Sequence, residues 1–126
     1  MKEEDREIWA GKNRLYFSED NILYITVLDE VDEVISTKMK EAFDKFAAMV
    51  EGKVNVLVDL NKVGLPSPGA RKIAQKAFEG ERINKVAFFG LHPVARVISS
   101  FVIGVTKKRE MRFFKTKEEA LTWLNE

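Results

Sequence analysis

Three side chains that could take part in chemistry follow apolar segments of this sequence: Asp59, Ser67 and His92. Asp59 comes directly after the β-branched run Val54–Val58, which predicts a strand covered on both faces. Ser67 precedes Pro68, an order typical of a helix N-cap with proline at the first helical position. A serine there lies among free backbone N–H groups, which suit an anion. We therefore expect an anion-binding, modification or partner site at this turn.

Two catalytic alternatives use the same residues. His92, Asp59 and Ser67 are expected at one edge of the sheet and could form a hydrolytic triad, but the sequence has no G-x-S-x-G elbow. Asp59 could also be the phosphoryl acceptor of a response-regulator receiver, with Asp29–Glu30 as the acidic pair and Lys115 as the strand-end lysine. Receivers begin with one parallel strand, whereas this chain predicts a hairpin. We therefore expect no catalytic residues, and we interpret Ser67 as a cap or as a phosphorylated or partner-contacting serine.

The composition is that of a soluble cytosolic protein. At 126 residues, with 45% hydrophobic and 33% charged residues, the chain is long enough for one domain with a buried core. A net charge of +1 argues against nucleic acid and polybasic membrane contacts. With no cysteine and one histidine, neither a disulfide framework nor a metal site is expected. The acidic N-terminus lacks the apolar core of a signal peptide, and no apolar run reaches membrane-spanning length, so we expect a cytoplasmic protein without cofactors.

Hydrophobic periodicity predicts an α/β fold. Residues 1–12 are expected to be a loose arm or a first edge strand. β-branched and aromatic segments predict strands at 15–17, 22–28, 54–58, 86–90 and 111–114. Apolar stripes predict four helices that begin at Ser36 or Thr37, Ser67, His92 and Thr116. The order ββαβαβαβα implies a single domain whose mixed, mostly parallel sheet starts with an antiparallel hairpin.

The third predicted helix has a wide apolar arc that includes Val97, Phe101 and Val105. Such an arc is typical of a well-buried core helix. Alternatively, the helix lines a hydrophobic crevice or meets a second copy of the chain, with Ile103 as the exposed apolar residue.

The element order, a strand that ends Asp59-Leu60 and a Ser/Gly turn that opens the next helix resemble the STAS domain of anti-sigma-factor antagonists. The segments 85–90 and 111–124 resemble the C-terminal signature of the SpoIIAA-like, or STAS/SEC14-like, branch. The resemblance spans roughly residues 14 to 126. In that family a serine or threonine at this turn is phosphorylated by a partner kinase. Ser67 and Gly69 match the motif, while Pro66 and Pro68 depart from it.

The resemblance implies a non-catalytic regulatory or binding module whose protein interaction is switched by phosphorylation of Ser67. The partner is expected to be another protein or a second copy of the chain. The expected partner surface consists of Asp59, Asn61, Gly69, Arg71, His92 and Arg96. The SEC14-like resemblance suggests an alternative, a small apolar or lipid-like ligand between the third helix and the sheet, next to Val97, Phe101 and Val105.

Overall fold

The computed structural model describes residues 2–64, 66–105 and 110–126, without the side chains of Asp29, Phe101, Val102 and Val105. The strands are β1 (Glu7–Ala10), β2 (Asn13–Phe17), β3 (Ile22–Asp29), β4 (Val54–Val63), β5 (Ile83–Phe89) and β6 (Met111–Phe114). The helices are a short 3₁₀ helix η1 (Glu3–Arg6), α1 (Glu33–Ala47), α2 (Pro68–Phe78), α3 (Pro93–Val105) and α4 (Lys117–Leu124).

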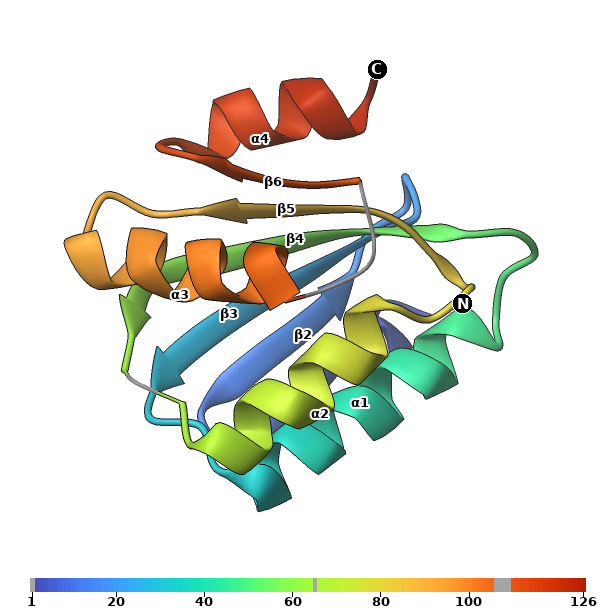
Figure 1. Cartoon of the computed structure of the whole chain (residues 1–126). Coiled ribbons are helices and arrows are strands. Elements are labelled where there is room, and N and C mark those ends of the chain that lie inside the picture. The colour runs from blue at the N-terminus through green and yellow to red at the C-terminus, as the bar shows by residue number, and fades with distance from the viewer. Residues whose placement is uncertain (1, 65, 106–109) are drawn as a thin grey trace.

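The six strands form one sheet in which the spatial order β1-β2-β3-β4-β5-β6 follows the chain (Figure 1). β1 to β3 pair antiparallel, and β3 to β6 pair parallel. The predicted order ββαβαβαβα, with a hairpin before the parallel strands, is therefore confirmed. Of the two alternatives for residues 1–12, the structure has the edge strand, because β1 pairs with β2.

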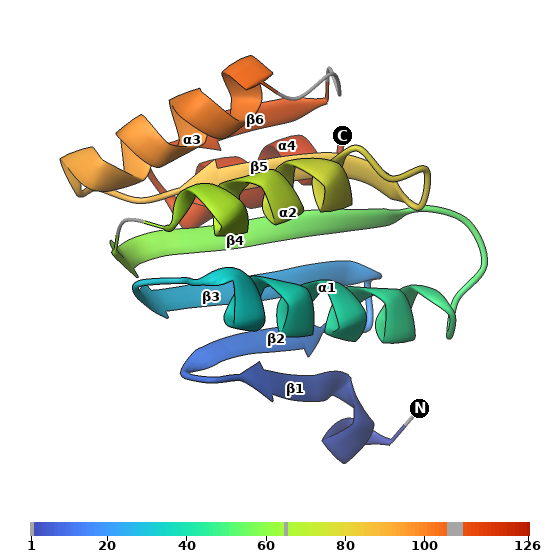
Figure 2. The same ribbon diagram turned by 60° about the horizontal axis from the view of Figure 1, so that its bottom comes forward.

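Three helices, α1, α2 and α3, lie side by side on one face of the sheet, and α4 alone lies on the other (Figure 2). Side chains alternate between the two faces along a strand. Val56 and Val58 of β4 therefore join Phe46 in the core under α1 to α3, whereas Leu57 packs with Trp123 of α4. Burial on both faces explains the nearly continuous apolar run of β4.

The predicted start of α1 at Ser36 or Thr37 was wrong, because the helix begins at Glu33 and is capped by Asp32. Asp32 Oδ1 accepts a hydrogen bond of 2.9 Å from the backbone N–H of Ile35. Aspartate is as good an N-cap as serine. Ser36 is buried instead, and its hydroxyl donates to the backbone oxygen of Ala70 at 3.2 Å, which joins α1 to α2.

The other predicted caps are confirmed. Ser67 caps α2 with Pro68 as the first helical residue, and Thr116 caps α4. β4 runs past the ends predicted for it, at Val58 from the apolar run and at Asp59-Leu60 from the resemblance, because the strand continues to Val63. Among the described residues, none of the helices combines the length and the apolar character needed to span a bilayer.

Candidate functional site

Ser67 joins the starts of two helices. Its Oγ accepts a hydrogen bond of 3.1 Å from the N–H of Ala70, as an N-cap does. Its own N–H donates to the backbone oxygen of Val31, at 3.0 Å, in the segment that leads into α1. The side chain is half-buried, in a shallow surface depression that it shares with Glu30, Val31 and Asp32. Ser67 is therefore an accessible hydroxyl beside acidic residues.

Gly69, the second residue of α2, is covered by the side chain of Glu33, the first residue of α1. A Cβ atom at position 69 would overlap the carboxylate of Glu33. The first turn of a helix carries positive partial charge, which favours a nearby carboxylate. We call the residues Glu30, Asp32, Glu33, Ser67 and Gly69 the Ser67 surface.

Asp59 lies apart from this surface. Because Val58 and Leu60 point into the core under α1 to α3, Asp59 points to the face that carries α4. Its Oδ1 accepts hydrogen bonds from the backbone N–H and the side-chain Nδ2 of Asn61, at 2.9 and 3.0 Å. Ser67 caps a helix on the opposite face, so the structure does not assemble a triad from Asp59 and Ser67.

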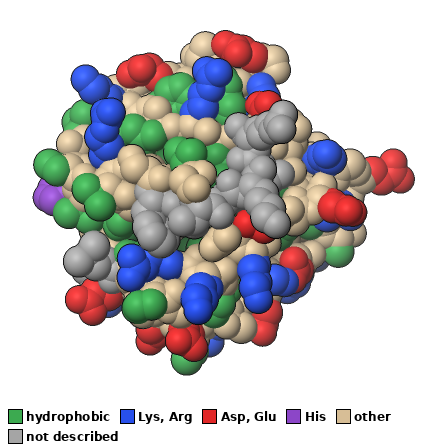
Figure 3. Space-filling model, in the orientation of Figure 1, with side chains coloured by type: hydrophobic (Ala, Val, Ile, Leu, Met, Phe, Trp, Pro, Cys, Tyr) green, Lys and Arg blue, Asp and Glu red, His purple; other side chains and the backbone are tan. Residues whose placement is uncertain are grey.

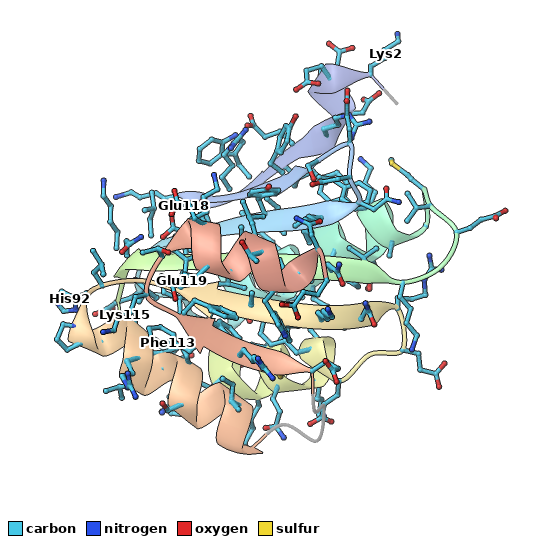
Figure 4. The ribbon with its side chains drawn as sticks, turned by 90° about the horizontal axis from the view of Figure 1, so that it is seen from above. Lys2, His92, Phe113, Lys115, Glu118 and Glu119 are labelled. Atoms are coloured by element: carbon cyan, nitrogen blue, oxygen red, sulfur yellow. The ribbon has the colours of Figure 1, made fainter. Side chains whose placement is uncertain are left out.

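Asn61 lies near the carboxyl end of β4, and His92 lies in the loop between β5 and α3. Asn61 Oδ1 accepts a hydrogen bond of 3.0 Å from the N–H of Leu91 and so ties the end of β4 to the loop after β5. His92 Nδ1 accepts from the N–H of Val94 at 3.1 Å. Figure 4 shows His92 and Lys115 at the same end of the sheet. His92 is exposed, in agreement with its interpretation as a loop residue.

The remaining predicted residues lie on α2 and α3. Arg71 is in the first turn of α2 and lines an apolar cavity. Arg96 is exposed on α3, with its guanidinium carbon 6.0 Å from the ring centre of Phe113. Val97 is 64% exposed and points away from the core. The side chains of Phe101 and Val105 lie outside the described residues.

Two adjoining apolar cavities, of about 100 and 60 Å³, lie between α1, α2 and the sheet. Both are lined by Ile25, Ser36, Met39, Ala74 and Phe78. Among the described side chains of α3, only Ile98 lines the larger one. Both cavities therefore lie mainly under α2, whereas the side chains of Phe101 and Val105, expected to line a crevice under the third helix, are outside the described ones. Figure 3 shows hydrophobic side chains on the outside of this helical face as well.

The part of the chain that the structure describes contains no group of three or more histidine and carboxylate side chains placed to hold a metal ion.

The hairpin argues against a response-regulator receiver. β2 and β3 pair antiparallel, whereas a receiver begins with one parallel strand.

Sequence reasoning did not find the role of Glu33. The predicted helix start at Ser36 or Thr37 leaves Glu33 outside the first helix, and the contact of Glu33 with Gly69 joins two helices that are separated by β4. The available signal was Gly69 itself, because glycine is a poor helix former and its place inside a first turn requires a reason.

The mixed sheet, with three helices on one face and one on the other, defines an α/β domain of the SpoIIAA-like (STAS) fold. The chain belongs to the family described as a domain of unknown function, DUF7793, whose model matches residues 16–126.

Three solved structures resemble the chain over most of its length. An uncharacterised DUF3478-family protein with a SpoIIAA-like fold from Shewanella loihica PV-4 has a TM-score of 0.68 and 20% identity, over 89% of this chain and 91% of that one. The anti-sigma factor antagonist SpoIIAA in its unphosphorylated form has a TM-score of 0.62 and 11% identity, over 90% of this chain and 97% of that one. An anti-sigma factor antagonist from Mycobacterium paratuberculosis has a TM-score of 0.63 and 16% identity, over 100% of both chains. A comparison with curated proteins gave no match.

Proposed function

We propose that this chain is a non-catalytic regulatory module that binds a protein partner through the Ser67 surface, and that phosphorylation of Ser67 switches this binding. The observation that carries the proposal is the position of Ser67, an accessible hydroxyl at the start of α2 that is tied to the start of α1. Two solved structures of the same fold are anti-sigma factor antagonists, one of them described as unphosphorylated, which supports a regulatory role.

The phosphorylation step needs a nucleoside triphosphate and a partner kinase. Ser67 Oγ forms a bond to the terminal phosphorus, the bond from that phosphorus to the diphosphate oxygen breaks, and the nucleoside diphosphate leaves. The hydroxyl proton passes to a base of the kinase. The new group carries a charge of about −1.5 to −2 at neutral pH. We place this step in the cytoplasm, where nucleoside triphosphates are available.

A matched pair of variants tests the switch. Ser67→Asn and Ser67→Asp both keep a good N-cap, and they differ in charge. Mass spectrometry of the protein from its own host should find a phosphate on Ser67 that is missing from Ser67→Ala. A protein partner that binds the immobilised wild type and Ser67→Asn should bind Ser67→Asp with a Kd about tenfold higher. This corresponds to a loss of about 1.4 kcal/mol in binding free energy. Absence of phosphate in every growth condition, together with equal retention by the two variants, would contradict the proposal.

A second copy of the chain is the other partner that we consider. Light scattering of the same two variants distinguishes the cases. A dimer of Ser67→Asn that Ser67→Asp does not form indicates self-association, whereas two monomers indicate a different protein.

A second candidate function is the binding of a small apolar ligand, and the cavities under α2 favour it. The larger one, of about 100 Å³, is smaller than an engineered apolar cavity of roughly 150 Å³ that binds benzene. It therefore fits a short apolar molecule or one segment of a longer acyl chain.

Ala74 lines both cavities, so Ala74→Leu should fill space that a ligand needs. Lys76→Leu adds the same side chain at an exposed position of the same helix and serves as the control. Short fatty acids or benzene should raise the melting temperature of the wild type and of Lys76→Leu, but not that of Ala74→Leu. Equal responses of all three proteins, or none, would exclude this site.

A further inference from the structure

We propose that Glu33 is a built-in competitor for the place that a phosphate on Ser67 would take at the start of α2. This inference rests on the proposed phosphorylation of Ser67. It goes further because it names the side chain of the protein that must respond to the modification.

The contact between Glu33 and Gly69 is the first observation. The end of the Glu33 side chain lies where a Cβ atom at position 69 would be, so the carboxylate can lie this close only to a glycine. Glycine is a poor choice for a helix, where alanine is the best. The missing side chain at position 69 therefore has a clear structural use: it makes room for the carboxylate of Glu33.

The second observation concerns the charges at the start of α2. The backbone groups of the first turn carry positive partial charge, which stabilises one nearby anion. Pro68 has no N–H group, and the N–H of Ala70 is already bonded to Ser67 Oγ at 3.1 Å. The N–H of Gly69 remains in this turn, beside the carboxylate of Glu33. A phosphate on Ser67 would be attracted to the same N–H groups at the start of α2. It would then lie next to the carboxylate of Glu33, and the two anions would repel each other.

Glu33, which contacts Gly69, can move away from the start of α2, whereas its neighbour Asp32 cannot. Asp32 is fixed by its cap hydrogen bond of 2.9 Å to the N–H of Ile35. The segment that leads into them is held to Ser67 by the bond from Ser67 N–H to the oxygen of Val31, at 3.0 Å. Glu33 is exposed, and its long side chain can rotate away from Gly69 without moving either helix.

The consequence is a change of surface in addition to a change of charge. When Ser67 is phosphorylated, the side chain of Glu33 rotates away from Gly69, and the backbone at the start of α2 becomes accessible. Val31, Pro66 and Arg71, which line the larger cavity, lie beside this point. A partner would therefore distinguish the two forms by the position of Glu33 as well as by the phosphate.

A double-mutant cycle on the isolated chain tests the competition. The cycle compares Ser67→Asp with Ser67→Asn, once with Glu33 in place and once in combination with Glu33→Gln. Without the charge of Glu33, we expect Ser67→Asp to melt about 1–4 °C above Ser67→Asn, because an anion at a helix start is stabilising. With Glu33 in place, this difference should vanish or change sign. Equal differences in the two backgrounds would overturn the proposal.

The matched control is Glu118→Gln. Glu118 is also an acidic residue in a first helical turn, but it lies on α4, on the opposite face of the sheet (Figure 4). It should leave the difference between Ser67→Asp and Ser67→Asn unchanged. If Glu118→Gln also makes Ser67→Asp melt above Ser67→Asn, the effect is due to net charge alone, and the role of Glu33 is refuted.

NMR provides an independent readout of position. A nuclear Overhauser contact between the side chain of Glu33 and the α protons of Gly69 should be present in Ser67→Asn and lost in Ser67→Asp. If both variants keep the contact, Glu33 does not give way. Because neither experiment needs a kinase or a partner, their failure refutes the role of Glu33 alone, while the phosphate analysis decides the proposed function separately.

Discussion

Arg82 donates a hydrogen bond of 2.6 Å from Nη2 to the backbone oxygen of Ala47, the last residue of α1. The same guanidinium also donates to the oxygens of Val50 and Gly52, at 2.7 and 3.2 Å. The last carbonyl groups of a helix have no partners within the helix, and the helix end carries negative partial charge. Arg82 therefore holds the end of α1 to the turn before β5.

Removal of this guanidinium should destabilise the protein. Arg82→Met keeps the apolar stem and loses three hydrogen bonds, so we expect a loss of about 1–3 kcal/mol in the free energy of unfolding, measured in urea. The control is Lys40→Met, which removes an exposed pair with Asp44 that contributes about 0.5 kcal/mol or less. Equal losses in the two variants would contradict the role of Arg82.

Gly69→Ala should show that the glycine accommodates Glu33. In the Glu33→Ala background, alanine at position 69 should stabilise the protein by about 0.5–1 kcal/mol, because alanine is the better helix former. In the presence of Glu33 the gain should be smaller or negative, since the carboxylate must first be displaced. Thermal unfolding of the wild type, Gly69→Ala, Glu33→Ala and the double variant measures the effect of Gly69→Ala with and without Glu33. Equal effects in the two backgrounds would argue against the contact.

Asn13 should be needed where the register between β3 and β4 shifts, between Thr26 and Leu28. It is buried, it donates to the oxygen of Ala10 at 3.1 Å, and it accepts from the N–H of Leu28 at 2.7 Å. Asn13→Ala removes the side-chain partner of the Ala10 oxygen and of the Leu28 N–H. The free energy of unfolding, measured in urea, should fall by about 1–3 kcal/mol. Asn125→Ala, which removes one exposed hydrogen bond, should cost much less.

Stability should fall at alkaline pH because of two tyrosines. Burial raises the pKa of Tyr24, and the hydrogen bond to Glu3 raises the pKa of Tyr16, both from the usual value of 10.0. A raised pKa means that the folded protein keeps the proton while the unfolded chain releases it. The stabilisation is therefore complete below pH 10 and is lost as the pH rises through the folded-state values.

Urea unfolding between pH 8 and 11 measures this loss. Tyr24→Phe cannot titrate at this position, so its stability should decline less steeply with pH than that of the wild type. Parallel curves for the two proteins would show that Tyr24 does not contribute.

Much of the fold could be predicted because its signals are local. The cap at Ser67, the cap at Thr116 and the strand Met111–Phe114 lie where the sequence places them. The start of α1 was missed because Asp32 stands in an acidic run that is typical of a loop, although its carboxylate serves as the cap. Local patterns are weakest where one residue type suits both a loop and a helix end.

The candidate site could be predicted only in part. Ser67 and Gly69 were identified from the turn that contains them, and both belong to the Ser67 surface. Asp59 was expected at the same edge, but β4 continues to Val63, so the alternation of the strand directs Asp59 to the other face.

The sequence by itself determined the type and order of most strands and helices and the capped turn at Ser67, though not the start of α1 or the end of β4, because each of these signals depends on neighbours within a few residues. Only the tertiary structure decided that Glu33 covers Gly69, that Asp59 and Ser67 lie on opposite faces, and that the cavities lie under α2. These relationships join segments that are distant in the chain. They depend on the length of β4 and on the way α1 and α2 pack over the sheet, and no local pattern encodes either.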